Sequence, residues 1–106
     1  MPKRRPMRRF PTRAAFEAWL EERRGLTVGV SRNERGCPLA TFLCATTGAP
    51  MAIVRPGTFS GGYWWTPDMG VSFARLPGWA MRFGRAIDEP GKEVVGAIEA
   101  LMVLRA

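Results

Sequence analysis

Histidine is missing from this sequence of 106 residues. Histidine is the commonest side chain in acid–base catalysis, the usual partner of a serine or cysteine nucleophile, and a frequent metal ligand. Its absence therefore excludes histidine acid–base catalysis, nucleophiles activated by histidine, and metal sites with histidine ligands. The carboxylates, among them Asp68, Asp88 and Glu99, are scattered along the chain and form no recognisable catalytic pair. We expect a protein that is not an enzyme and that carries no cofactor.

Cysteine is scarce, with only Cys37 and Cys44. Both fall on one predicted helix, where their Cα atoms would lie roughly 10 Å apart, too far for a disulfide. Two thiols are also too few for a structural zinc site within one chain. Cys37 is the better candidate for a reactive thiol, because a helix N-terminus and the nearby Arg35 both favour the thiolate. The alternative is a buried packing position, which free cysteines often occupy.

Long apolar runs are also lacking, since no stretch reaches the roughly 18 residues of a membrane-spanning helix. The basic N-terminus is not followed by the apolar segment of a signal peptide, because Pro11, Arg13 and Glu17 occupy that place. We expect no membrane partner. Free thiols without an export signal fit the reducing cytoplasm.

Acidic residues are absent from the first 13 positions, and this absence divides the charge of the chain. The net charge is +7. Residues 14–106 hold ten cations and nine acids, so this part is nearly neutral. The prolines Pro2, Pro6 and Pro11 disfavour helix, which predicts an extended basic arm over residues 1–12. The cations of the first 13 residues are Lys3, Arg4, Arg5, Arg8, Arg9 and Arg13.

Residues 13–106 read as a single domain of the α+β class. Apolar residues at helical spacing predict helices over residues 13–24, 37–47, 77–88 and 95–105. In the last of these, Ile98, Leu101 and Met102 are expected to face inward. Residues 26–30, 51–55, 63–66 and 70–74 are expected to be strands. Because helices and strands do not alternate regularly, we predict a small, mainly antiparallel sheet of three to four strands packed with about four helices.

The aromatic run Tyr63-Trp64-Trp65 lies on a predicted strand, where alternation sends Tyr63 and Trp65 to one face and Trp64 to the other. An open face could stack a nucleic-acid base or anchor a partner protein, with Arg55 on the adjoining strand adding charge. We take Tyr63 and Trp64 as candidate partner contacts. The alternative is that helices or a second copy cover both faces. The glycines of Ser60-Gly61-Gly62 fit a hairpin turn better than a phosphate cradle.

A set of short segments resembles small uncharacterised domains encoded in bacterial genomes and mobile elements. The similarity spans about residues 14–104 and leaves out the basic arm. It implies no activity, and the cysteine and the aromatics in it look like packing positions. The segments are Phe16 with Trp19-Leu20, Val28-Gly29-Val30, Cys37-Pro38-Leu39-Ala40 with Phe42-Leu43, and Trp79-Ala80 with Phe83.

The arm gives the leading functional hypothesis, which is a non-catalytic module that binds nucleic acid mainly through phosphates. An acidic protein surface could be gripped by the same cations, and a solvated tail is the plain alternative. A second hypothesis is a protein-interaction module, such as an adaptor or a phage-encoded inhibitor, that docks through the aromatic hairpin, and a homo-oligomer is a further option. The candidate nucleic-acid contacts are Lys3, Arg4, Arg5, Arg8, Arg9, Arg13 and Arg55.

Overall fold

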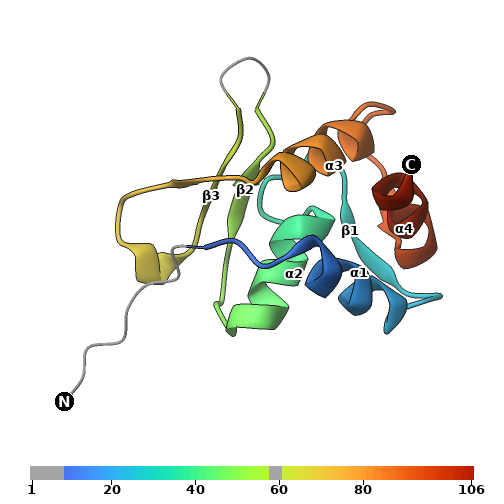
Figure 1. Ribbon diagram of the computed structural model, residues 1–106, viewed down its shortest axis with the longest axis horizontal. Helices are drawn as coiled ribbons and strands as arrows, with labels where there is room; N and C mark the ends of the chain where they lie inside the picture. Colours follow the sequence, from blue (N-terminus) through green and yellow to red (C-terminus); the bar gives the residue numbers. More distant parts are fainter. Residues whose placement is uncertain (1–8, 58–60) are drawn as a thin grey trace.

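The computed structural model describes residues 9–57 and 61–106 (Figure 1). The candidate contacts Lys3, Arg4, Arg5 and Arg8 lie outside the described residues. Within those ranges the chain is an α+β protein with helices, two small antiparallel sheets and a short 3-10 turn, which confirms the predicted class. The helices are α1 (Arg13–Glu21), α2 (Pro38–Thr47), α3 (Gly78–Asp88) and α4 (Ala97–Arg105), and the turn η1 is Pro67–Met69. The strands are β1 (Thr27–Val30), β2 (Ile53–Arg55), β3 (Tyr63–Trp65), β4 (Ala74–Arg75) and β5 (Val94–Gly96).

The strands divide between two sheets rather than forming one. β2, β3 and β4 make an antiparallel sheet in sequence order, whereas β1 pairs with β5 from the far end of the chain. We expected β5 to be part of the last helix, and this expectation was wrong at its start. The valines of β5 pair with β1, with Val95 opposite Gly29. The amide of Ala97 donates to the Leu26 carbonyl at 2.9 Å. Helix α4 therefore begins only where the backbone pairing with the β1 segment ends.

Helix α1 begins where the sequence predicts and ends earlier. The Thr12 hydroxyl accepts a hydrogen bond from the amide of Ala15 at 3.1 Å, which caps the helix. Phe16, Trp19 and Leu20 are its buried side chains. The last regular residue is Glu21, and turns fill the three positions before Gly25.

The core is built around aromatic rings. The ring of Phe16 lies 5.0 Å from the rings of Phe42 and Phe83, so α1, α2 and α3 meet at this side chain. Trp64 of β3 is fully buried and joins the same cluster. The three-stranded sheet therefore covers one side of the helical core.

Helix α4 presents a different face to the core from the one we predicted. Leu101 is buried as expected, but Ile98 is 49% exposed and Met102 is 70% exposed. The buried face runs through Ala97, Ala100, Leu101 and Leu104. Small alanines let α4 pack closely on its neighbours, and this leaves the longer side chains of Ile98 and Met102 in solvent.

Glycines lie where β2 and β3 enter the loop that connects them. Gly57 has a φ of +75°, and a Cβ there would lie 1.8 Å from the carbonyl oxygen of Gly61. Gly62 is buried, and a Cβ on it would lie 2.5 Å from the Pro56 carbonyl oxygen. These glycines therefore allow the two backbone segments to approach each other closely, because any side chain would overlap the facing backbone. Ser60 lies outside the described residues.

Candidate functional site

The basic arm is anchored to the body through Phe10. This side chain is only 7% exposed, and its ring lies edge-on to Trp64 with centroids 5.4 Å apart and planes at 82°. The Phe10 ring also meets Trp79 of α3 at 5.7 Å. The expected boundary at residue 12 is therefore too late, because Phe10 already belongs to the hydrophobic core.

Three arginines surround the point where the arm joins the body. Arg9 precedes Phe10, and Arg13 and Arg82 line one shallow pocket of about 300 Å³ beside Trp79. Within the described residues, none of the three forms an ion pair with a carboxylate. We call Arg9, Arg13, Arg82 and Trp79 the arm-root surface. It is a cationic patch next to an aromatic ring, although Arg82 was not among the candidates from the sequence.

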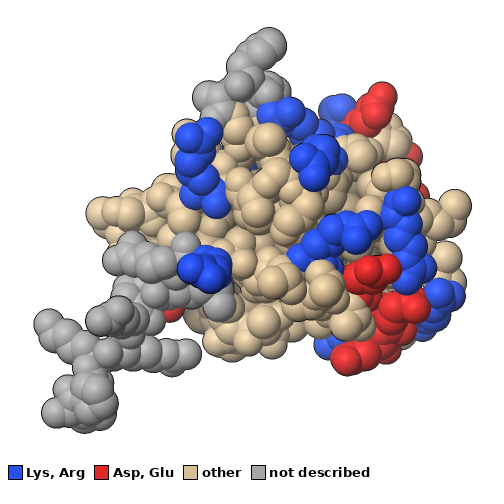
Figure 2. All heavy atoms as spheres, viewed as in Figure 1, with Lys and Arg blue, Asp and Glu red and all other residues tan. Residues whose placement is uncertain are grey.

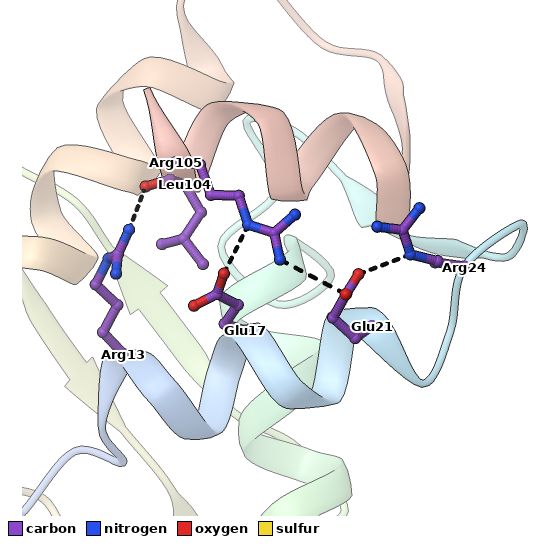
Figure 3. A network of polar contacts seen from close by, with 6 residues as sticks. All are labelled: Arg13, Glu17, Glu21, Arg24, Leu104 and Arg105. Carbon is purple, nitrogen blue, oxygen red and sulfur yellow. Dashed lines mark hydrogen bonds and ion pairs between the residues drawn. The ribbon is translucent and has the colours of Figure 1, made fainter.

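The acids of α1 are occupied elsewhere, along the contact between α1 and α4 (Figure 3). Arg105 donates to Glu17 at 2.6 Å and lies 3.6 Å from Glu21, which also pairs with Arg24 at 2.7 Å. The hydrogen bond from Arg24 lowers the pKa of the Glu21 carboxyl, and the hydrogen bond to Glu17 raises the pKa of Arg105. These carboxylates are therefore paired with local cations and form no ion pair with the arginines of the arm-root surface.

Arg13 has a structural contact that the sequence did not suggest. Its guanidinium donates to the Leu104 carbonyl oxygen at 3.0 Å, near the C-terminal end of α4 (Figure 3). A cation favours this end of a helix, because the last carbonyls carry partial negative charge. The contact uses a carbonyl rather than a carboxylate, so it brings no negatively charged side chain to the arm-root surface.

The charges on the face shown in Figure 2 are unevenly distributed. In the view of Figure 2, most acidic side chains gather on the right, where cations lie among them. The cations over the left and upper parts of this face have few acidic neighbours.

The two faces of the three-stranded sheet differ sharply. Val54, Trp64 and Ala74 lie opposite one another in register and point into the core. The prediction that Trp64 contacts a partner is therefore wrong, because its side chain is fully buried. Alternation sends the neighbouring residues to the other side. We call the residues there, Arg55, Tyr63, Trp65, Phe73 and Arg75, the outer sheet face.

Arg55 is less available than the sequence suggested. Its Nε lies 2.8 Å from the Glu34 carboxylate, and its guanidinium lies 5.1 Å from the ring centroid of Phe73. Both side chains of the ion pair are about half exposed, so the pair is weak in water. An incoming anion would therefore compete with Glu34 for this cation.

Tyr63 is accessible, with 37% of its surface exposed, and Phe73 is 41% exposed. The sequence missed Phe73 and Arg75 as site residues, because the predicted strand over residues 70–74 placed the pairing too early. The residue in register with Tyr63 on β4 is Arg75. The repeat of aromatic and basic residues on alternate positions was the signal that could have found both.

Cys37 is a packing residue rather than a reactive thiol. Its side chain is buried at the start of α2, and burial raises the pKa of the thiol to about 11. Of the two alternatives for Cys37, the structure favours the buried packing position, because removal from water outweighs the helix N-terminus, and the charge of Asp88 raises the pKa further. Burial also raises the pKa of Cys44. A thiol that stays protonated is a poor nucleophile.

Over residues 9–57 and 61–106, no group of three or more cysteine, aspartate or glutamate side chains is arranged to hold a metal ion. No helix in the same ranges has the length and hydropathy needed to cross a bilayer. Comparison with protein family models, curated proteins and solved structures gives no match. The resemblance to small bacterial and mobile-element domains stays a prediction, and the functional argument depends on the two surfaces described above.

Proposed function

We propose that this protein is a non-catalytic nucleic-acid-binding module that grips phosphates with its basic arm and its arm-root surface. The observation that carries the proposal is the continuity of charge. In the sequence, Lys3, Arg4, Arg5 and Arg8 lead directly to Arg9. On the body, Arg13 and Arg82 follow, and neither has a carboxylate partner among the described residues. A cationic surface of this kind gains affinity by releasing the counterions of a polyanion.

Phe10 supports the proposal, because it sets where the cations can act. Its packing against Trp64 and Trp79 ties the arm to the junction of β3 and α3. A nucleic acid held by the arm is thereby brought against the arm-root surface, and the two sets of cations act on one ligand. Tethering of this kind raises the effective concentration for the second contact.

The test is the salt dependence of binding to a fluorescent 20-nucleotide DNA, both single-stranded and as a duplex. The key variant lacks residues 1–8, which removes four cations and leaves Phe10 in the core. We expect the slope of log Kobs against log [salt] to fall in magnitude by up to about 3, at roughly 0.7 to 0.9 for each phosphate that is no longer neutralised. Arg9→Ala and Arg82→Ala should each lower the slope by up to about 0.9.

Lys92→Ala is the matched control, because it removes an exposed cation on the turn between α3 and β5. Its slope should equal that of the intact chain. An intact chain that binds neither DNA form, or an arm deletion with an unchanged slope, would rule out the proposal.

The second candidate, a protein-interaction module docking through the hairpin, is favoured by the exposure of Tyr63 and Phe73. It needs a different contact set from the one that the sequence suggested, since Trp64 is buried. A partner that is retained after removal of residues 1–8 and released by Tyr63→Ala would favour this candidate. An acidic protein surface as the ligand of the arm would show as competition with nucleic acid for the same cations.

A further inference from the structure

The aromatic side chains of the outer sheet face are held in place by the fold. Tyr63 and Trp65 stand on β3, and Phe73 directly precedes β4. The rings of Trp65 and Phe73 lie 6.4 Å apart at 34°, and the Trp65 indole donates to the Gly70 carbonyl oxygen at 2.6 Å. The rings of Trp65 and Phe73 are therefore positioned before any ligand arrives, which limits the entropy lost on binding.

Core packing does not explain the exposure of Tyr63 and Phe73, whereas Trp65 packs partly against the core. The sheet contributes to the core through the opposite face, where Trp64 and Val54 are buried. On the outer sheet face, Ile53 is covered although it is not part of the main core cluster, and it lies in register with Trp65. Tyr63 and Phe73 stand beyond this small patch and keep about two fifths of their surface in solvent.

The charges around the rings select a polyanion. Tyr63 lies in register with Arg55 on one side and with Arg75 on the other. Neighbouring strands are about 4.8 Å apart, so both arginines stand on strands next to that of Tyr63. The Arg55 guanidinium reaches over the ring of Phe73, and the Arg75 guanidinium lies near Gly61. Glu34, the partner of Arg55, lies at the β2 side of this row.

A row that alternates cation, ring and cation fits a nucleic acid with unpaired bases. Every base has a π-face that can stack on an aromatic side chain, while its phosphates contact the flanking cations. In a duplex the bases are already stacked inside the helix and cannot reach a sheet surface. The chemistry of the row therefore distinguishes single strands from duplexes.

The arm root and the outer sheet face lie on opposite sides of β3, because Phe10 packs on the core side of this strand. Phe10 contacts Trp64, and the two chain neighbours of Trp64 are the outward residues Tyr63 and Trp65. A single strand that contacts both the arm and the rings therefore has to pass an edge of the three-stranded sheet. Resting on the proposed function, we infer that the ligand is a single-stranded nucleic acid whose bases stack on Tyr63 and Phe73 of the outer sheet face.

The test compares Tyr63→Ala, Phe73→Ala and the intact chain for binding to one labelled oligonucleotide as a single strand and as its duplex. Each substitution should weaken single-strand binding about 5- to 150-fold, the range for removal of one base–aromatic stack. Duplex binding and the salt slope should not change, because the phosphate contacts remain. Tyr63→Phe keeps the ring and should bind as the intact chain does.

Met102→Ala is the matched control, because it truncates an exposed apolar side chain on α4, away from the sheet. Circular dichroism and the thermal midpoint establish that each variant is folded. Glu34→Gln adds an opposite effect, since it frees Arg55 from its ion pair. It should tighten single-strand binding about two- to fivefold, as expected for an exposed pair.

A second measurement does not depend on any substitution. An oligonucleotide carrying 5-bromouracil is irradiated in complex with the intact chain, and the cross-linked residue is mapped by mass spectrometry. Cross-links at Tyr63, Trp65 or Phe73 support the inference, and cross-links found only at other residues contradict it.

The remaining outcomes separate the two proposals. If both alanine variants bind single strands as the intact chain does, while removal of residues 1–8 weakens binding, the stacking inference is wrong and the proposed function stands. Equal losses for single strand and duplex would also overturn stacking. A variant that loses self-association on size exclusion would assign the face to protein contacts instead. If the intact chain binds no nucleic acid, both proposals fail together.

Discussion

Phe10 meets Trp64 edge-on, with ring centroids 5.4 Å apart and planes at 82°. The contact joins a residue that directly follows the basic arm to a strand in the middle of the chain. Edge-to-face pairs add about 0.5 to 1.5 kcal/mol to the effect of burying the rings. The last residues of the predicted arm are therefore part of the folded body, and this contact decides how the arm should be shortened in experiments.

Phe10→Ala should destabilise the protein by about 3 kcal/mol, because it removes a buried ring from its packing against Trp64 and Trp79. Urea unfolding followed by tryptophan fluorescence measures the change. Arg9→Ala alters the adjacent exposed residue and should shift the free energy of unfolding by less than about 0.5 kcal/mol. A Phe10→Ala protein as stable as the intact chain would show that the arm is not anchored there.

Trp64→Ala and Tyr63→Ala should destabilise the protein to different extents, because the two residues lie on opposite faces of the three-stranded sheet. Loss of the fully buried Trp64 should cost about 3 to 5 kcal/mol, whereas loss of the partly exposed Tyr63 should cost about 1 kcal/mol. Thermal melts of the two variants under one set of conditions provide the comparison. Equal destabilisation would mean that the outer sheet face is covered.

Cys37 should be inert toward thiol reagents. With a pKa of about 11, only about one thiol in ten thousand is ionised at pH 7. Iodoacetamide labelling at Cys37 should therefore be far slower than for a small thiol in solution. Rapid modification of Cys37 in the folded protein would contradict its burial.

The raised pKa of Cys37 also predicts that the protein loses stability at alkaline pH. The folded pKa of about 11 lies above the usual value of 9.0, so between these pH values the unfolded chain releases a proton that the folded chain retains. The contribution is fully present below pH 9 and is lost as pH rises toward 11, by up to about 2 to 3 kcal/mol. Urea unfolding at pH 8, 9.5 and 10.5 should show a steeper decline for the intact chain than for Cys37→Ala. Parallel declines would argue against this assignment.

Gly57→Ala should disrupt the β2–β3 hairpin where β2 enters the connecting loop. Its φ of +75° disfavours any side chain, and the new Cβ would overlap the Gly61 carbonyl. We expect a loss of about 2 kcal/mol or more. Gly48 has the same φ with open space around it, so Gly48→Ala should cost only about 1 to 2 kcal/mol, and the difference isolates the overlap.

The α+β class and the helices could be predicted from the sequence, because their signals are local. Thr12 and Gly25 bracket the first helix region, and Phe16 and Leu20 repeat at helical spacing. Trp64 also follows a local rule, since alternation placed it opposite Tyr63 and Trp65. What alternation could not decide is which of the two faces would be covered.

The errors concern contacts between residues far apart in the chain. Val95 reads as the start of a helix until β1 is available to pair with it. Ile98 and Met102 fit an inward stripe as well as Leu101 does, and the positions of α1 and α3 select the other side of α4. Cys37 illustrates the same limit, because the depth of burial that sets its pKa comes from residues elsewhere in the sequence.

The α1–α4 contact and the β1–β5 pairing also affect how the chain folds during synthesis. Arg13 bonds to Leu104 across 91 positions, and Thr27 pairs with Gly96. The first helix and first strand must wait for partners that the ribosome makes roughly 3 to 18 s later. During that interval their apolar sides have only early segments such as α2 to pack against. A nascent chain halted before β5 would keep this surface accessible to chaperones.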